Sequence, residues 1–302
     1  MIIDPIDLKL IRQLELHGSI SHHEIIGKFQ ITEDEINLRI RNLEDSGFIS
    51  DYGIKLFIPG VVGGRWYWGC IASESTAQFR PERSVPCLEE IVENLTFPAG
   101  VCPDLSLLFY TQNLQDTYKI INKTPGIKYA EIYKIDEFDV EVKKVLLEDD
   151  WQLIAQLCDS LSTLSYARIN SIIYKPESDD EVRLSRLVWS CKNRKGVVSI
   201  FPNFDWSVIN NYAHLHVAVT SSIRIKELRR IINKLGFSGN IASRFKKRFI
   251  QLEFDVWGFS EMQTIFSSLR EINKLTIEGY SLAHKNKIYN DWLRHYIKSK
   301  IS

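Results

Sequence analysis

Apolar residues recur every three or four positions at the beginning of the chain, which is the spacing of one face of a helix. In the first such segment these positions are Leu8, Ile11 and Leu14. Glycine readily adopts the left-handed backbone that ends helices, and Gly18 follows this segment. The pattern therefore predicts a first helix of about ten residues that ends at His17.

Two sequence patterns of the type Ser/Thr-x-x-Glu then mark the starts of two further helices. The first runs from Ser21 to Glu24 and the second from Thr32 to Glu35. The third helix carries a row of apolar residues, namely Ile36, Ile40 and Leu43. After Gly47, the β-prone residues 48–57 around Tyr52-Gly53 predict a two-stranded hairpin. Three helices followed by a hairpin are typical of a winged helix-turn-helix.

The same pattern returns in the second half of the chain. The helix start Thr32–Ile36 has a counterpart in Ser178–Val182, and the segment Asp7–Leu14 has one in Asp150–Leu157. Repetition over this length predicts a tandem duplication. The second copy is three residues longer between its helix start and Gly196, so it is degenerate at the end of its third helix.

A β-prone region follows each winged module. In the second half, apolar and polar residues alternate over 214–219 and 250–256, which predicts strands with one buried face, and helices are predicted at 225–235 and 260–269. In the first half, strands are predicted at 65–72, 96–100, 105–110 and 127–135. Helices are predicted through Leu88, Ile91, Val92 and Leu95, and through Leu114, Tyr118 and Ile121. The order βαββαβ is that of the ferredoxin-like fold.

The sequence thus predicts an α+β chain in which two winged helix-turn-helix modules alternate with two ferredoxin-like βαββαβ domains. The expected boundaries are 1–62, 63–146, 147–208 and 209–302. The last residues, Trp292 to Ile297, predict an amphipathic helix that docks either on this chain or on a second subunit.

Two segments and one tyrosine resemble the Lrp/AsnC family of prokaryotic transcription regulators. They are Ile6–Ile11, Ile40–Ile49 and Tyr52. The resemblance implies a third helix that enters the major groove of DNA and an effector-binding (RAM-type) sheet domain behind it. On that basis Asn37 is a candidate base contact, while Arg39 and Arg41 are candidate phosphate contacts. Three acidic residues, 33–35, oppose this interpretation, and a solvated helix face is the alternative.

Charge is divided unequally along the 302 residues, although 38 Lys/Arg balance 38 Asp/Glu overall. Residues 1–150 carry 15 Lys/Arg and 25 Asp/Glu, and residues 151–302 carry 23 and 13, so their formal charges are −10 and +10. The candidate DNA contacts of the second copy are Arg168, Arg183, Arg186, Lys192, Arg194 and Lys195. A basic second half favours double-stranded DNA as partner. The alternatives are that the two halves attract each other and that these residues form a solvated surface.

The segment from Gly100 to Asp104 resembles the Gly-x-x-Asp turn of Lrp/AsnC proteins, which implies a small-molecule effector such as an amino acid. Here the turn is one residue longer and contains Pro103, so an ordinary turn is the alternative. No cofactor or metal is predicted, because the five cysteines are widely spaced and form no Cys-x-x-Cys pair.

The chain shows no apolar run long enough for a membrane span and no signal peptide, so a cytoplasmic protein without a membrane partner is expected. Lrp/AsnC proteins dimerise through their sheet domains. For this chain, we therefore expect either a homodimer or a pseudo-dimer formed within one chain.

Three functions remain open from the sequence. The first is a sequence-specific DNA-binding transcription regulator, which is not an enzyme. The second is an enzyme that resembles the sirohaem decarboxylases, which are built from paired Lrp/AsnC-like halves and need basic and histidine side chains in a tetrapyrrole pocket. His214 and His216 lie on a predicted strand that can line such a pocket, or they form its solvated polar face. The third is a regulator subunit that binds proteins without binding DNA.

Overall fold

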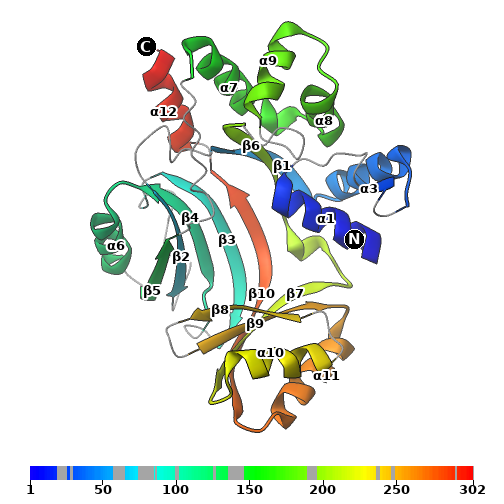
Figure 1. The fold of residues 1–302 in the computed structure, drawn as a ribbon, viewed down its shortest axis with the longest axis vertical. Coiled ribbons are helices and arrows are strands. Elements are labelled where there is room, and N and C mark those ends of the chain that lie inside the picture. Colours follow the sequence, from blue (N-terminus) through cyan, green and yellow to red (C-terminus); the bar gives the residue numbers. More distant parts are fainter. Residues whose placement is uncertain are drawn as a thin grey trace.

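The computed structural model shows two winged modules lying over a single curved sheet of eight strands (Figure 1). It describes residues 1–18, 26–27, 30–56, 65–73, 85, 87–98, 102–124, 127–134, 146–188, 196–235, 239–245, 249–289 and 291–301. Within these ranges no helix is long and apolar enough to cross a membrane.

The first winged module contains α1 (Pro5–His17), α3 (Glu33–Asp45) and β1 (Ile49–Leu56). Asp4 caps α1 by accepting hydrogen bonds from the backbone of Ile6 and Asp7, and Gly18 ends it with a φ of 70°. The Thr32 side chain accepts from the backbone N–H of Glu35, as its sequence pattern predicted. Of the second predicted helix, only residues 26–27 are described, and its start at Ser21 lies outside the described residues.

The second module contains α7 (Glu148–Ser160), α8 (Tyr166–Tyr174), α9 (Asp179–Leu187) and β6 (Val198–Phe204). A short 3₁₀ turn, η1 (Leu161–Thr163), follows α7, and another, η2 (Trp206–Val208), follows β6. Ser178 caps α9 through the backbone N–H of Glu181, so the repeated helix start has the same role in both modules.

The predicted hairpin in residues 48–57 is wrong. Residues 49–56 form one continuous strand that passes through Tyr52 and Gly53 and pairs antiparallel with β6 of the other module. Because the partner strand lies some 150 residues further along the chain, the local turn signal at Tyr-Gly is overridden by a long-range ladder. The two wings therefore join the two modules into one unit, which is a pairing within the chain.

The sheet combines two groups of four strands. The first group is β2 (Arg65–Ser73), β3 (Leu88–Phe97), β4 (Leu105–Thr111) and β5 (Ile127–Lys134), and the second is β7 (Ala213–Ser221), β8 (Gly239–Phe245), β9 (Phe249–Val256) and β10 (Leu275–Ile288). The strand order is β5-β2-β4-β3-β10-β7-β9-β8, so each group has the ferredoxin-like order and β3 joins β10.

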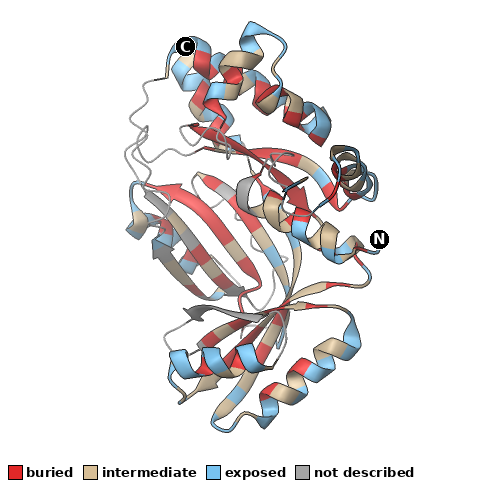
Figure 2. Cartoon of the chain, turned by 45° about the vertical axis from the view of Figure 1, so that its right-hand side comes forward, coloured by how far each residue is buried: buried red, intermediate tan, exposed pale blue. Residues whose placement is uncertain are grey.

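Helices cover the outer face of this sheet, while the winged modules lie on its inner side (Figure 1). The outer helices are α6 (Leu114–Lys123), α10 (Ile225–Lys234) and α11 (Phe259–Glu271). Their apolar faces meet the strands in two separate cores, one built around Ile121 and Phe109 and the other around Leu228 and Phe254. The buried residues follow the strands and the inner helix faces (Figure 2).

The helix predicted through Leu88, Ile91, Val92 and Leu95 is also wrong, because these residues lie in β3. This strand is central, with β4 on one side and β10 on the other. A bulge between Leu88 and Glu90 interrupts the alternation, so Leu88 and Ile91 reach the same core although they are three residues apart. Their spacing therefore imitated that of a helix face.

A third core is shared by both winged modules and the C-terminal helix α12 (Asp291–Ile301). Leu293 and Ile297 of this helix are buried, and the Tyr296 ring meets Trp151 of α7 at 5.5 Å. The predicted amphipathic helix therefore docks on its own chain.

Candidate functional site

A cavity of about 580 Å³ lies between the winged modules and the inner face of the sheet. Both winged modules and both halves of the sheet contribute to its walls. The charged and polar lining residues include Arg12, Glu15, Lys55, Glu90, Asn94, Ser106, His214, His216, Gln251, Glu253, Ser281 and Asn286. Because both winged modules and both halves of the sheet supply side chains to this cavity, a ligand bound there would contact all four parts.

The polar residues at one end of the cavity come from the alternation along β7 and β9. Leu215 and Val217 of β7 turn outward into the core beneath α10 and α11, so His214 and His216 turn inward. In the antiparallel register, His214 lies opposite Asp255 and His216 lies opposite Glu253. Residues directly opposite on one face have side chains in contact range, which brings each histidine next to a carboxylate.

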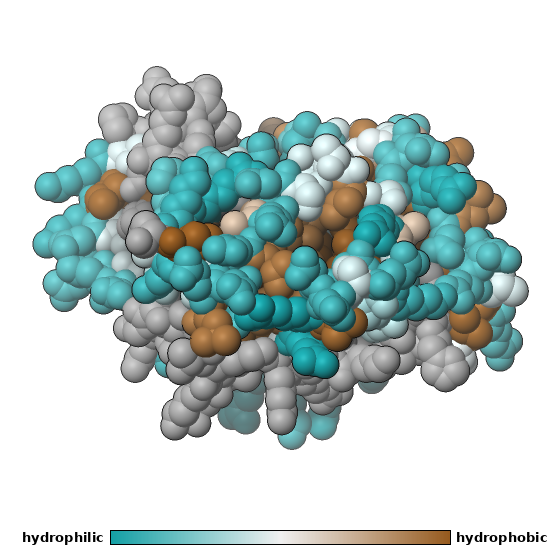
Figure 3. Space-filling model, turned by 90° about the horizontal axis from the view of Figure 1, so that it is seen from above, coloured by the Kyte–Doolittle hydropathy of each residue, from teal (hydrophilic) through white to brown (hydrophobic). Residues whose placement is uncertain are grey.

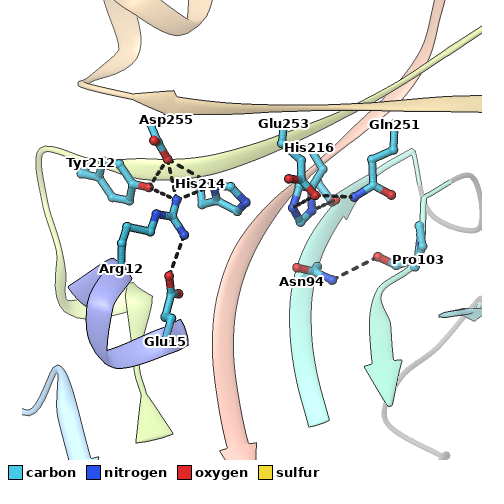
Figure 4. A network of polar contacts seen from close by, with 11 residues as sticks. Arg12, Glu15, Asn94, Pro103, Tyr212, His214, His216, Gln251, Glu253 and Asp255 are labelled. Atoms are coloured by element: carbon cyan, nitrogen blue, oxygen red, sulfur yellow. Dashed lines mark hydrogen bonds and ion pairs between the residues drawn. The ribbon is translucent and has the colours of Figure 1, made fainter. Parts of the chain in front are cut away.

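Arg12 reaches this end of the cavity from α1 (Figure 4). Its Nη2 donates to Asp255 Oδ1 at 2.6 Å and to the Tyr212 hydroxyl at 2.9 Å, and its Nη1 donates to Glu15 at 2.7 Å. The Tyr212 hydroxyl also donates to Asp255 Oδ1, at 2.6 Å. A helix of the first winged module is thereby fixed to a strand of the second sheet group.

These contacts set the ionisation of the cluster. Burial alone would raise the pKa of Asp255, but hydrogen bonds from His214 and Tyr212 and the charge of Arg12 hold it well below its usual value. Burial opposes the charge of Arg12 as well, yet Glu15 and Asp255 raise the pKa of its guanidinium further. Arg12 and Asp255 are therefore a permanent ion pair near neutral pH.

His216 is held in the neutral form. Burial lowers its pKa to about 3, and the neighbouring His214 and Arg12 act in the same direction. Burial also raises the pKa of Glu253. The Nε2 of His216 lies 3.6 Å from Glu253 Oε1, which is too long for a hydrogen bond, and the two histidine rings meet edge to face at 4.7 Å. A neutral imidazole and a carboxylate that lie side by side are groups that bind metal ions.

The other end of the cavity contains a second ion pair. Lys55 of β1 donates to Glu90 of β3 at 2.6 Å, and both side chains are largely buried. The Lys55 ammonium also lies 4.4 Å from the centre of the Phe201 ring. The cavity thus offers groups of both signs, and two of its ion pairs, Arg12–Asp255 and Lys55–Glu90, come from different parts of the fold.

The predicted effector turn lies beside this cavity. Asp104 is buried, and its backbone accepts from Asn94 N–H and donates to Ile71 C=O. Its neighbour Pro103 lines the cavity, whereas Gly100 lies outside the described residues. An effector role for Gly100 and Asp104 stays a prediction.

The predicted DNA contacts of the first module differ in their burial and in their contacts with other residues. Arg39 donates to Asp4 and Asp7 at 2.8 Å and to Glu35 at 3.1 Å, so it ties α3 to the start of α1. The Asn37 Oδ1 is buried, which does not suit a contact with a base edge. Arg41 is exposed on α3.

The second module repeats this arrangement. Arg183 of α9 donates to Asp150 at 2.8 Å and to Asp149 at 3.0 Å, at the start of α7. Arg168 is paired with Glu181. Arg186 is exposed, and Lys192, Arg194 and Lys195 lie outside the described residues. In each module, therefore, an arginine of the third helix stabilises the packing of the first. From the side of the winged modules, the surface is largely hydrophilic with small separate apolar patches (Figure 3).

Replacing Arg39 by alanine is expected to lower the free energy of unfolding by about 1–3 kcal/mol. The reason is that Asp7, whose side chain is only 13% exposed, then loses a charged donor. Urea denaturation of the purified chain measures the change. The matched control is Arg41→Ala on the same helix, which is expected to stay within about 0.5 kcal/mol of the parent. Equal losses in the two variants would show that the Arg39 ion pairs contribute nothing.

The fold and the cavity together define a protein with two winged helix-turn-helix modules mounted on a ligand-sized cavity in a ferredoxin-like sheet. Residues 3–50 match the family described as winged helix-turn-helix DNA-binding. No curated protein matches the chain.

The chain is also similar to several solved structures, at low sequence identity. The siroheme decarboxylase NirDL is 14% identical over 98% of both chains with a TM-score of 0.42. Its co-complex with an iron-uroporphyrin III analogue is 13% identical over 98% of this chain and 97% of that chain, with a TM-score of 0.44. LrpC of B. subtilis is 20% identical over 45% of this chain and 96% of its own, with a TM-score of 0.28. Likenesses this distant leave the function to be argued from the site.

Proposed function

We propose that the chain is a transcription regulator of the Lrp/AsnC type, which binds double-stranded DNA through its winged modules and a small effector in the central cavity. The observation that carries this proposal is Arg12. It lies within the matched winged helix-turn-helix segment, yet its guanidinium is bonded to Asp255 on β9. A ligand that competes for Arg12 or Asp255 acts directly on the first helix of the DNA-binding module.

The cavity favours an effector that carries both charges. Arg12 and Lys55 can meet an anionic group, while Glu90 and Glu253 can meet a cationic one. A zwitterion such as an amino acid satisfies both without leaving a buried charge alone. This composition supports the effector class that the resemblance to Lrp/AsnC proteins implies.

The DNA contacts in this proposal exclude the two arginines that hold the modules together. Arg39 and Arg183 are each bonded to two or more carboxylates, and breaking these pairs opposes binding to phosphate. Phosphate contact is therefore assigned to Arg41, Arg186 and the run from Lys192 to Lys195.

A salt-dependent titration with duplex DNA tests the proposal. We expect the intact chain to bind at low salt, and the triple variant Lys192→Ala, Arg194→Ala, Lys195→Ala to bind more weakly. Each phosphate contact contributes about 0.9 to the slope of log K against log salt, so the slope should fall by about 2 to 3. The affinity and slope follow from fluorescence anisotropy at several salt concentrations.

The matched control removes three positive charges from α10, as Lys226→Ala, Arg229→Ala and Arg230→Ala. This helix lies on the outer face of the sheet, away from the winged modules (Figure 1). Removing these three charges is expected to leave the slope of log K against log salt unchanged. An intact chain that binds no DNA at low salt contradicts the proposal, and an equal loss of slope in both triple variants removes the second module from the interface.

A second candidate function is a tetrapyrrole decarboxylase, because His214 and His216 line the cavity between the winged modules and the sheet. The charges of the cavity oppose it, since the lining contains Glu15, Glu90 and Glu253 and a tetrapyrrole polycarboxylate is strongly anionic. Addition of an iron tetrapyrrole distinguishes the two functions. A shifted visible absorption band that is lost in His214→Ala/His216→Ala favours the enzyme.

A further inference from the structure

We infer that His214, His216 and Glu253 form a binding site for a divalent first-row transition metal ion such as Zn²⁺ or Co²⁺. Each of the three offers one ligand atom, and these atoms lie within 4.8 Å of one another. Two imidazoles and one carboxylate are a set that such ions take. This inference does not depend on whether the chain binds DNA.

The distances fit a metal better than a direct contact between the side chains. Ligand atoms about 2.0–2.1 Å from a tetrahedral zinc ion lie about 3.3–3.4 Å from one another. His216 Nε2 and Glu253 Oε1, at 3.6 Å, are close to this spacing, yet they are too far apart for a hydrogen bond. Two polar atoms that converge without bonding each other leave room for an ion between them.

Asp255 orients the imidazole of His214 for binding through Nε2. Asp255 Oδ1 lies 3.3 Å from His214 Nδ1, and Ser281 Oγ lies 3.5 Å from His216 Nδ1. An acceptor at Nδ1 fixes the tautomer that leaves the Nε2 lone pair available, which is the usual arrangement around metal-bound histidines. Arg12 Nη2 lies 3.0 Å from His214 Nδ1. In this tautomer Arg12 Nη2 donates to Asp255 Oδ1, 2.6 Å away, and not to the histidine.

The local charge also favours a dication. Around the two histidines stand the carboxylates of Glu15, Glu253 and Asp255 and the guanidinium of Arg12. Three negative groups against one positive group leave an excess negative charge that a divalent ion neutralises.

The ion has one side open to solvent or ligand. His214, His216 and Glu253 all line the 580 Å³ cavity, so three protein ligands hold the ion on the sheet and the remaining coordination positions face the cavity. A closed structural site uses four protein ligands, whereas an open site keeps a place for water or an exchangeable ligand. The site is therefore of the open kind.

Titration of the full-length, chelator-treated protein with Co²⁺ tests the inference. We expect one equivalent to bind with the visible bands of a low-symmetry nitrogen and oxygen site, without a thiolate charge-transfer band. His214→Ala/His216→Ala is expected to weaken binding by more than about 100-fold, and Asp255→Asn by about 10–100-fold through loss of the orienting carboxylate. Equilibrium dialysis with Zn²⁺ gives the stoichiometry and affinity independently of colour.

The matched control is His284→Ala/His295→Ala, which removes two histidines that lie outside the cluster. It is expected to bind as the parent does. Circular dichroism verifies the fold of each variant, and Glu253→Gln replaces the double variant if the latter does not fold. The inference is overturned if the parent binds no Co²⁺, or if a folded cluster variant binds it with unchanged affinity and spectrum.

Discussion

Replacing Gly18 by alanine is expected to destabilise the chain by about 3–5 kcal/mol, which is enough to prevent folding of a marginal domain. Gly18 has a φ of 70°, a conformation that costs a residue with a Cβ about 1–2 kcal/mol. A Cβ at this position would also lie 1.8 Å from the carbonyl oxygen of Ile200 on β6. Backbone cannot rotate away as a side chain can, so α1 would have to leave the wing strand.

Gly47 provides the matched control for this prediction. Its φ is 76°, nearly that of Gly18, but a Cβ there would meet nothing within 4 Å. Gly47→Ala is therefore expected to lose only the conformational part, about 1–2 kcal/mol. Urea denaturation followed by circular dichroism measures both variants. Losses that agree within about 0.5 kcal/mol would show that the approach of α1 to β6 is not close in solution.

Replacing Phe204 by alanine is expected to lower the free energy of unfolding by about 3–5 kcal/mol. Phe204 is 2% exposed at the end of β6, and its ring stacks on Phe48 of the first module with centroids 5.0 Å apart. Trp206 meets the same Phe48 ring edge to face at 5.0 Å. The truncation leaves a hole in a core to which both winged modules contribute, so neither module can relax around it alone.

Thermal denaturation of Phe204→Ala should show both modules unfolding in one transition at a lower temperature. The control is Phe259→Ala, since Phe259 is 71% exposed at the start of α11 and its loss should stay within about 0.5 kcal/mol. Two separate transitions, with only one of them shifted, would mean that the modules do not share a core.

Much of the fold was predictable because its signals are local. The helix starts at Thr32 and Ser178, the helix end at Gly18 and the alternation along β7 and β9 each depend on neighbouring residues in the sequence. The strand pairs were not local. The segment of β1 was predicted as a hairpin but pairs with the distant β6, and that of β3 was predicted as a helix but pairs with the distant β10.

The candidate site was predictable only in part for the same reason. His214 and His216 were visible as one face of a strand, but the sequence did not show that this face borders a cavity. Arg12 carried no signal beyond its place on the polar side of a helix. Its partners Tyr212 and Asp255 lie more than 190 residues away, and only the docking of α1 on the second sheet group brings them together.

Two of the candidate DNA contacts already have partners within the chain. Basic residues on a third helix favour contact with phosphate, yet Arg39 and Arg183 are satisfied by carboxylates of their own module. Their acidic partners, Asp7 and Asp150, occupy corresponding places in the repeated lead segments. Acidic residues at the start of a first helix were thus an available sign that the arginines stabilise the module.

The join between β3 and β10 has a further consequence for the sheet. In each group the strand order is fourth, first, third and second, so the join connects the second strand of one group to the fourth strand of the other. In a two-fold arrangement a contact between unlike strands occurs twice. The second contact would pair β8 with β5, which are the two outermost strands, and no ladder joins them among the described residues.

Among the described residues the sheet is therefore an open sheet of eight strands in which one of these two contacts is formed. Each of the two outer strands keeps one edge that is not used by a ladder in the described residues. Forming the second contact would complete the ring of strands around the inner face, where His214 and His216 lie.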